Sequence, residues 1–160
     1  MRLLTYTNLY PSETQPRHGI FVEERLRHLV ASGRIDADVC ALRPRNSLKP
    51  ALYFGRSRQA ATETRHGLRV SYVDVPTLPL ITNWVDPVLW ARASRNVVTE
   101  LAGVPRNDTI IDAHFLYPDA VAAVILARRL RLPVVMTARG SDVNVKCENP
   151  VMRRWVRWAA

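Results

Sequence analysis

Short apolar runs alternate along this chain with longer stretches in which apolar residues recur at helical spacing. The apolar runs have the length of strands, and they are Arg2–Thr7, Ala37–Leu42, Leu68–Val75, Thr109–Phe115 and Pro133–Ala138. The stretches with helical spacing are Gly19–Ser32, Ile81–Ala102, Pro118–Leu130 and Asn149–Trp158. This alternation predicts an α/β fold with a doubly wound, mostly parallel sheet and helices on both faces.

Glycine and proline mark the expected ends of several elements. Gly33 and Gly103 follow the first two helical stretches, a position where glycine commonly ends a helix. Pro118 suits the first turn of the third helix, and Asp119 beside it complements the helix dipole, so we expect Asp119 to be structural. Residues 44–66 give no clear pattern and fit either a short helix or an excursion over the sheet.

Composition places the chain among globular proteins of ordinary make-up. Its 160 residues correspond to one domain, residues 1–160, with 48% hydrophobic and 23% charged residues. The longest apolar run, Ala120–Ala127, is too short to span a bilayer, and the first residues lack the apolar core of a signal peptide. Cys40 and Cys147 imply no disulfide framework and are not spaced with histidines as a zinc site requires. We therefore expect a reducing, cytoplasmic environment.

The chain is basic, with a net charge of +9. Between Arg43 and Arg69, seven basic residues accompany a single acid, Glu63. Such a surface favours anionic partners, including the acidic headgroups at the inner face of a membrane, although an arginine-rich solvated loop accounts for the same charge. No nucleic-acid-binding motif accompanies the charge, so we expect no nucleic-acid partner. Glu23 and Glu24 are expected to lie on a solvated helix face.

Three predicted loops follow strands at the carboxyl edge of the sheet, where open α/β sheets bind ligands. They are Asn8–His18, His114–Pro118 and Arg139–Lys146. Gly19 opens a helix after the first loop, where it either lets the backbone approach a phosphate or merely permits the turn. Neither GxGxxG nor a Walker motif is present, so no ordinary dinucleotide site is supported. His114 ends a buried strand, where it either binds a sugar hydroxyl or phosphate or donates to a loop carbonyl.

The third loop holds the best single candidate for anion binding. Arg139 follows a strand, and its planar, permanently charged fork can neutralise a diphosphate; an ion pair with Asp142 is the rival interpretation. Gly140 lets the chain turn sharply, while Ser141 and Asp142 can accept hydrogen bonds from backbone donors of the loop. No serine-hydrolase elbow of the GxSxG type is present.

Four segments, in this order, resemble the N-terminal domain of family 4 glycosyltransferases: Asn8–Pro11, Gly19–Glu24, His114–Asp119 and Thr137–Asp142. The resemblance covers nearly the whole chain. It implies the N-terminal half of a GT-B fold, in which two Rossmann-like domains face each other across a cleft. It also implies a retaining, metal-independent transferase without a cofactor, whose donor substrate is a nucleotide-diphosphate sugar and whose acceptor is a glycan or a lipid-linked glycan.

The same resemblance implies roles for individual residues. His114 would lie near the acceptor or the transferred sugar, and Arg139 stands where many members have a histidine that touches the sugar. These two are the predicted catalytic residues. Gly19 would bring its backbone near the donor diphosphate, and His18 before it occupies a position where a second glycine is frequent. The predicted donor-binding residues are His18, Gly19, Gly140, Ser141 and Asp142, and no metal ligand is predicted.

The predicted elements end where the second half of a cleft would follow. We therefore expect this chain to be the acceptor-side half of a two-domain enzyme, inactive alone, with the C-terminal nucleotide-sugar domain outside it. A non-enzymatic Rossmann-like module that binds a ligand or a partner is the alternative.

Overall fold

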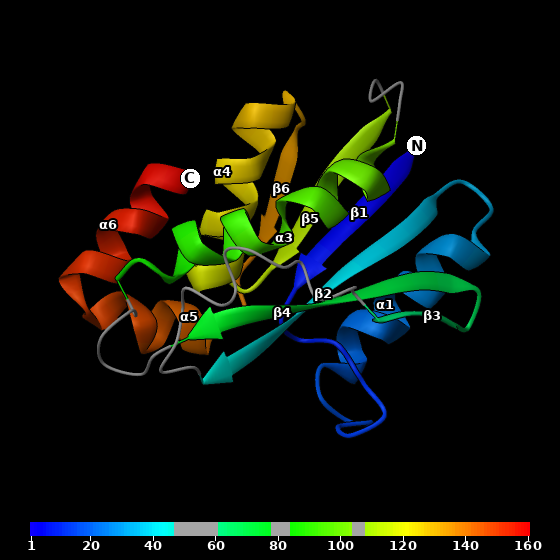
Figure 1. Ribbon diagram of the computed structural model, residues 1–160, viewed down its shortest axis with the longest axis horizontal. Helices are drawn as coiled ribbons and strands as arrows, with labels where there is room; N and C mark the ends of the chain where they lie inside the picture. Colours follow the sequence, from blue (N-terminus) through cyan, green and yellow to red (C-terminus); the bar gives the residue numbers. More distant parts are fainter. Residues whose placement is uncertain (47–60, 78–83, 104–107) are drawn as a thin grey trace.

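The computed structural model describes residues 1–46, 61–77, 84–103 and 108–160. Its centre is a six-stranded sheet in the order β3-β4-β2-β1-β5-β6 (Figure 1). All neighbouring strands are parallel except β3, which runs antiparallel to β4. The strands are β1 (Arg2–Thr7), β2 (Asp36–Asn46), β3 (Ala61–Arg65), β4 (Leu68–Thr77), β5 (Thr109–His114) and β6 (Val134–Thr137). Apart from β3, the strands follow a Rossmann-like order, in which β1 lies between β2 and β5.

Helices cover both faces of this sheet. On one face lies α1 (Ile20–Ala31), and on the other lie α3 (Asp86–Ala102) and α4 (Val121–Leu130) (Figure 1). A further helix, α6 (Pro150–Ala159), packs outside α4. The predicted α/β class with helices on both faces is thereby confirmed. No helix within the described ranges is long and apolar enough to cross a lipid bilayer.

Strand β2 shows how the two halves of the core are separated. Val39 and Ala41 pack with α1, whereas Cys40 and Leu42 pack with α3 and α4. Successive side chains of a strand point to opposite faces, so an apolar run without alternation fills both halves of the core. The near-continuous apolar character of the central strands is therefore what a sheet covered on both faces requires.

The part of the sequence without a clear pattern contains an antiparallel strand. Residues 47–60 lie outside the described residues, and β3 follows them. It pairs with β4 across the two-residue turn His66-Gly67, whose φ angles are 49° and 80°. Positive φ at both central residues is typical of a tight hairpin. The expectation of a helix or an excursion therefore missed this edge strand.

The second predicted helix begins later than its apolar pattern suggests. Of its predicted first residues, 81–83 lie outside the described residues, and Trp84 and Val85 form a turn. The helix itself begins at Asp86, with Pro87 in its first turn, and ends before Gly103 as expected. Proline lacks a backbone N–H and therefore suits a first helical turn.

The third predicted helix begins at Val121 rather than at Pro118. Residues Leu116–Ala120 form a kinked turn, η1, in which Tyr117 is extended with φ −130° and ψ 124°. Asp119 lies in the first turn of η1, which leads directly into α4. Its carboxylate also binds a backbone N–H of another loop, which agrees with the expected structural role.

The arginines of the basic stretch are ion-paired wherever the structure describes them. The pairs are Arg43 and Arg45 with Asp74, Arg65 with Glu23 and Glu63, and Arg69 with Asp38. The other basic residues of the stretch, Lys49, Arg56 and Arg58, lie outside the described residues. Glu23 is only 3% exposed, so the expected solvated face is wrong for Glu23.

Candidate functional site

The loops after β1, β5 and β6 meet at the carboxyl edge of the sheet. The backbone N–H of Asn8 in the first loop donates to Asp119 Oδ2 at 2.7 Å. The backbone N–H of Leu116 donates to Asp142 Oδ2 in the third loop at 2.6 Å. Since β1 lies between β2 and β5, these loops surround the point where the strand order reverses, which is the expected ligand position. The structure thus brings the three predicted loops together.

Asp142 organises the third loop through main-chain contacts. It is 0% exposed and lies in the short helix α5 (Ser141–Asn144). Besides Leu116, it accepts the backbone N–H of Arg139 at 2.9 Å and that of Val143 at 3.1 Å. This is the backbone-acceptor role foreseen from its residue type. A direct contact between Asp142 and a donor substrate stays a prediction.

Asp119 is the second carboxylate that holds the loops. It is 0% exposed, and its Oδ1 has no hydrogen-bond partner among the described residues. Burial raises the pKa of Asp119 well above the usual 3.8, and hydrogen bonds from Asn8 N–H and the Thr7 hydroxyl offset only part of this rise. A carboxyl with a raised pKa binds a proton more tightly in the folded protein than in the unfolded chain.

Asp119 therefore makes stability depend on pH in a defined direction. Because the folded pKa lies above the unfolded value, the free energy of unfolding falls as pH rises from about 4 to the folded pKa. The Asp119→Asn variant lacks this titration, so its stability relative to the original chain should increase between pH 4 and pH 8. Urea unfolding at a series of pH values measures this difference.

The exposed carboxylate of Asp36 provides the control. Asp36→Asn removes an exposed carboxylate, and its pH series is the reference for that of Asp119→Asn. A constant difference for Asp119→Asn would contradict the raised pKa. The pKa of Asp112 is lowered instead of raised. Asp112 therefore changes the free energy of unfolding only below about pH 4, where its stabilising contribution is lost as the pH falls.

A charged cluster lies between α1 and the carboxyl ends of β5 and β6. Arg25 Nη1 donates to Asp112 Oδ2 at 2.5 Å, and His114 Nε2 lies 3.2 Å from the same oxygen. Arg139 Nη2 lies 2.7 Å from His114 Nδ1. Residues from three elements thus form one connected network around a histidine that is 0% exposed.

These contacts select one tautomer of His114. A guanidinium can only donate, so Nδ1 must accept from Arg139 and therefore carries no hydrogen. The ring hydrogen is then on Nε2, where it donates to Asp112 Oδ2. Arg25 Nη1 also lies 3.3 Å from Nε2, but its shorter contact, at 2.5 Å, is the donation to the same Asp112 oxygen. The expectation that His114 donates to a loop carbonyl is not met, because its partner is a carboxylate. His114 supports its neighbours instead of opening onto solvent.

Asp112 is 1% exposed and supplies the negative charge of this network. Burial by itself raises the pKa of Asp112, but hydrogen bonds from His114 and Arg25 and the positive charge of Arg25 outweigh it and hold the pKa below the usual 3.8. Asp112 Oδ1 has no hydrogen-bond partner in the described part of the chain. The carboxylate is therefore ionised at neutral pH and fixes both Arg25 and His114.

Arg139 is the half-buried cation of the network. Its guanidinium stacks on the ring of Phe21 at 4.6 Å from the centroid. Burial and the charge of Arg25 lower its pKa, while Asp112 and Asp142 raise it in part. Within the described residues no ion pair joins its guanidinium to Asp142, which it contacts only through its backbone N–H. The rival interpretation of Arg139 as the partner of Asp142 is thus not supported.

Gly19 lies at the start of α1 under tight steric constraint. Its φ is +67°, and a Cβ there would lie 2.2 Å from the backbone carbonyl carbon and oxygen of Leu9. Close packing against the first loop therefore explains the glycine without a ligand. His18 is exposed and its Nε2 donates to the carbonyl of Asn8 at 3.0 Å. Contacts of Gly19 and His18 with a diphosphate stay predictions.

The other two residues predicted to bind the donor lie at the third loop's turn. Gly140 has a φ of +82° and open space where a side chain would be. Ser141 is exposed and donates its backbone N–H to the carbonyl of Arg139. Both are accessible at the carboxyl edge of the sheet. Their predicted role in donor binding stays a prediction.

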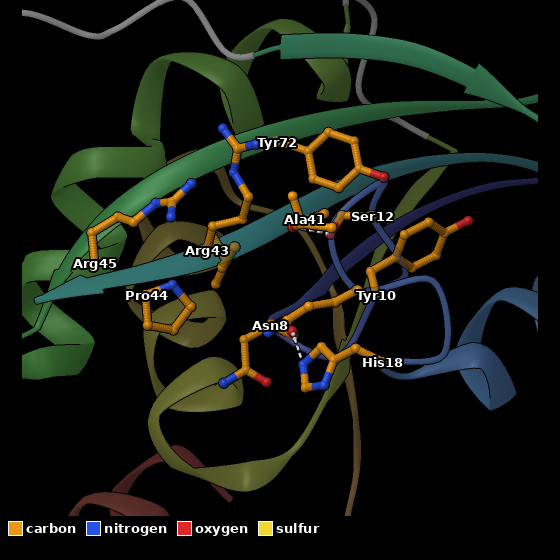
Figure 2. A pocket seen from close by; sticks show the side chains of 12 residues that line it. Asn8, Tyr10, Ser12, His18, Ala41, Arg43, Pro44, Arg45 and Tyr72 are labelled. Carbon is orange, nitrogen blue, oxygen red and sulfur yellow. Dashed lines mark hydrogen bonds between the residues drawn. The ribbon is translucent and has the colours of Figure 1, made fainter.

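A pocket of about 140 Å³ opens beside this cluster, between the β1–α1 loop and the carboxyl end of β2 (Figure 2). Arg43 and Arg45 extend from β2, and Asn8, Tyr10 and His18 come from the loop. Apart from His18, the sequence analysis singled out none of these side chains as site residues. The pocket widens the candidate site from the β1–β5 junction to the neighbouring strand.

The chain is similar in sequence to a bacterial protein. No protein-family model matches the chain. Over 149 residues, or 91% of this chain, it is 29% identical to a protein of Bacillus subtilis (strain 168) named "Putative teichuronic acid biosynthesis glycosyltransferase TuaC". The chain spans 38% of the length of that relative.

Proposed function

We propose that this chain is the acceptor-side, N-terminal domain of a GT-B glycosyltransferase similar to family 4. The whole protein transfers a sugar, with retention and without a metal ion or cofactor, from a nucleotide-diphosphate donor to a glycan or lipid-linked acceptor. It acts in the cytoplasm, in peripheral contact with the inner face of the membrane. The similarity to a glycosyltransferase along 91% of the chain carries this proposal. The Rossmann-like strand order agrees with it.

In this proposal Arg139 stabilises the leaving diphosphate. Breaking the bond between the anomeric carbon and the diphosphate builds negative charge on the leaving oxygen, so a fixed cation lowers the barrier. His114 and Phe21 hold the guanidinium in place before the reaction. Since His114 is 0% exposed, it acts as a positioning residue for Arg139 in the geometry seen here.

A transfer assay with the product of the complete reading frame tests the function. The donors are a panel of nucleotide-diphosphate hexoses, and the acceptor fraction is extracted glycan and glycolipid. Turnover should occur with the complete product, and Arg139→Ala should lower kcat/KM about 100-fold because it removes a preorganised cation. The 160-residue chain alone should give no turnover.

Arg129→Ala is the matched control, because Arg129 is an exposed arginine on α4. It should leave kcat/KM unchanged. If the complete product neither binds nucleotide sugars nor transfers sugar, a non-enzymatic binding module explains the chain better. Equal activities of the Arg139→Ala and Arg129→Ala variants would remove Arg139 from the proposed site.

A further inference from the structure

Two arginines that line this pocket share one carboxylate, that of Asp74. Arg43 Nε lies 2.9 Å from Asp74 Oδ1, and Arg45 Nε lies 3.2 Å from the same oxygen. Two positive charges thus share one negative charge, so the end of β2 keeps a net positive charge. Asp74 contacts both guanidinium groups at Nε, and no described residue accepts from their terminal nitrogens. These forked nitrogens are the donors that bind carboxylates and phosphates.

Two polar atoms on the loop side of the pocket also have no partner among the described residues. They are Asn8 Oδ1 and the hydroxyl of Tyr10, and both are buried. Burial raises the pKa of the Tyr10 phenol, so its hydroxyl stays a hydrogen-bond donor. Buried polar atoms are normally satisfied, so the loop side of the pocket keeps hydrogen-bonding capacity that the described residues do not use.

The pocket wall near Arg43 is aromatic. The Arg43 guanidinium lies over the ring of Tyr72, 5.2 Å from its centroid. The Tyr72 hydroxyl donates to the Pro11 carbonyl at 2.6 Å and lies 2.6 Å from a carboxylate oxygen of Glu63. These two contacts fix the position of Tyr72, and its ring in turn holds the guanidinium of Arg43 in place. A preoriented cation binds an anion with a smaller loss of side-chain entropy.

We propose that this pocket binds the anionic group of an acidic saccharide acceptor, a carboxylate or a phosphate, through Arg43 and Arg45. The inference rests on the proposed transferase function and gives the chemical class of its acceptor. Strand β1 separates this pocket from the ends of β5 and β6, where Arg139 lies. An acceptor anchored by its anionic group in the pocket would therefore extend across the end of β1 towards the reacting sugar.

Binding to the 160-residue chain tests the anion site without any need for turnover. The probes are glucuronate, glucose 6-phosphate and glucose, and NMR titration measures their dissociation constants. At least one of the two acids should bind ten-fold or more tightly than glucose. The tighter of the two identifies the source of the anion as a carboxylate or a phosphate. Equal affinity for all three probes would overturn the inference.

Substitutions connect the binding to the two arginines. Arg43→Gln combined with Arg45→Gln should weaken acid binding at least ten-fold and leave glucose binding unchanged. Arg129→Gln combined with Arg153→Gln removes the same charge from exposed positions on α4 and α6 and should leave both unchanged. The single variant Arg45→Gln affects a half-exposed side chain, so it should fold and still weaken acid binding. Equal losses in the two double variants would overturn the assignment.

The transfer assay separates this inference from the proposed function. If the complete product transfers sugar equally well to neutral and acidic acceptors, and Arg45→Gln has no effect, the acceptor class is wrong while the transferase function stands. If acids bind through Arg43 and Arg45 but the complete product never transfers sugar, the proposed function fails. In that case the pocket is an anion site without an acceptor role, and the inference fails as stated.

Discussion

Gly19→Ala should lose about 3–5 kcal/mol of unfolding free energy. The new Cβ would lie 2.2 Å from the carbonyl carbon and oxygen of Leu9, so the β1–α1 loop would have to move. The φ of +67° adds the cost of a left-handed conformation for an alanine. Urea unfolding measures the loss, which should come with weaker ligand binding because the loop also carries Asn8 and Tyr10.

Gly33→Ala isolates the conformational part of that cost. Gly33 has almost the same φ, +68°, but nothing lies within 4 Å of its added Cβ. It should therefore lose only about 1 kcal/mol. Similar losses for the two variants would show that the contact with Leu9 does not constrain the loop.

Asp142→Ala should be the second strongly destabilising substitution, with a loss of about 4 kcal/mol. It removes the acceptor from the buried N–H groups of Leu116 and Arg139, and each unsatisfied donor costs roughly 1–3 kcal/mol. The N–H of Val143 keeps a hydrogen-bond partner in this variant, because it also donates to the carbonyl of Gly140. Chemical unfolding measures the loss, and hydrogen exchange should accelerate at Leu116 and Arg139.

An exposed acid close in sequence serves as the control. Glu148→Ala removes a carboxylate from the 3₁₀ turn Lys146–Glu148 and should change the unfolding free energy by less than about 0.5 kcal/mol. A small effect of Asp142→Ala would mean that water replaces the carboxylate, and that the second and third loops do not depend on it.

The fold was predictable because most of its strands are buried on both faces. Arg2–Thr7 and Thr109–His114 are buried nearly throughout, and the glycines after α1 and α3 mark the helix ends. Strand β3 escaped prediction because an edge strand needs no apolar face, and its residues alternate among threonine, glutamate and arginine. The dipeptide His66-Gly67 before an apolar run was a usable hairpin signal.

The candidate site was predictable in position but not in its contacts. His114 ends a strand and Arg139 follows one, and strand order alone brings them to one edge of the sheet. Their direct hydrogen bond, and the stacking of Arg139 on Phe21, depend on side-chain directions that spacing does not give. One signal was available: Asp112 is a charged residue inside a buried strand and requires a cationic partner.

The ion-pair partners of the buried charged residues could not be predicted from the sequence, and the reason is physical. Glu23 pairs with Arg65, which is 42 residues away and on a strand that was not predicted. Arg25 reaches Asp112 across 87 residues. Helical spacing identifies which face of α1 is apolar, but it does not say which charged positions at the border of that face bend inward.

The contacts that join the three loops do not depend on the identity of most of the loop side chains. Asp119 and Asp142 hold the loops by binding main-chain N–H groups, and every residue except proline has such a group. The exposed side chains of the first loop, such as Thr14, Gln15 and His18, can therefore change identity while the loops keep their positions. Directed evolution of substrate preference should accordingly begin at these residues, because their substitution should reduce the stability of the fold only slightly.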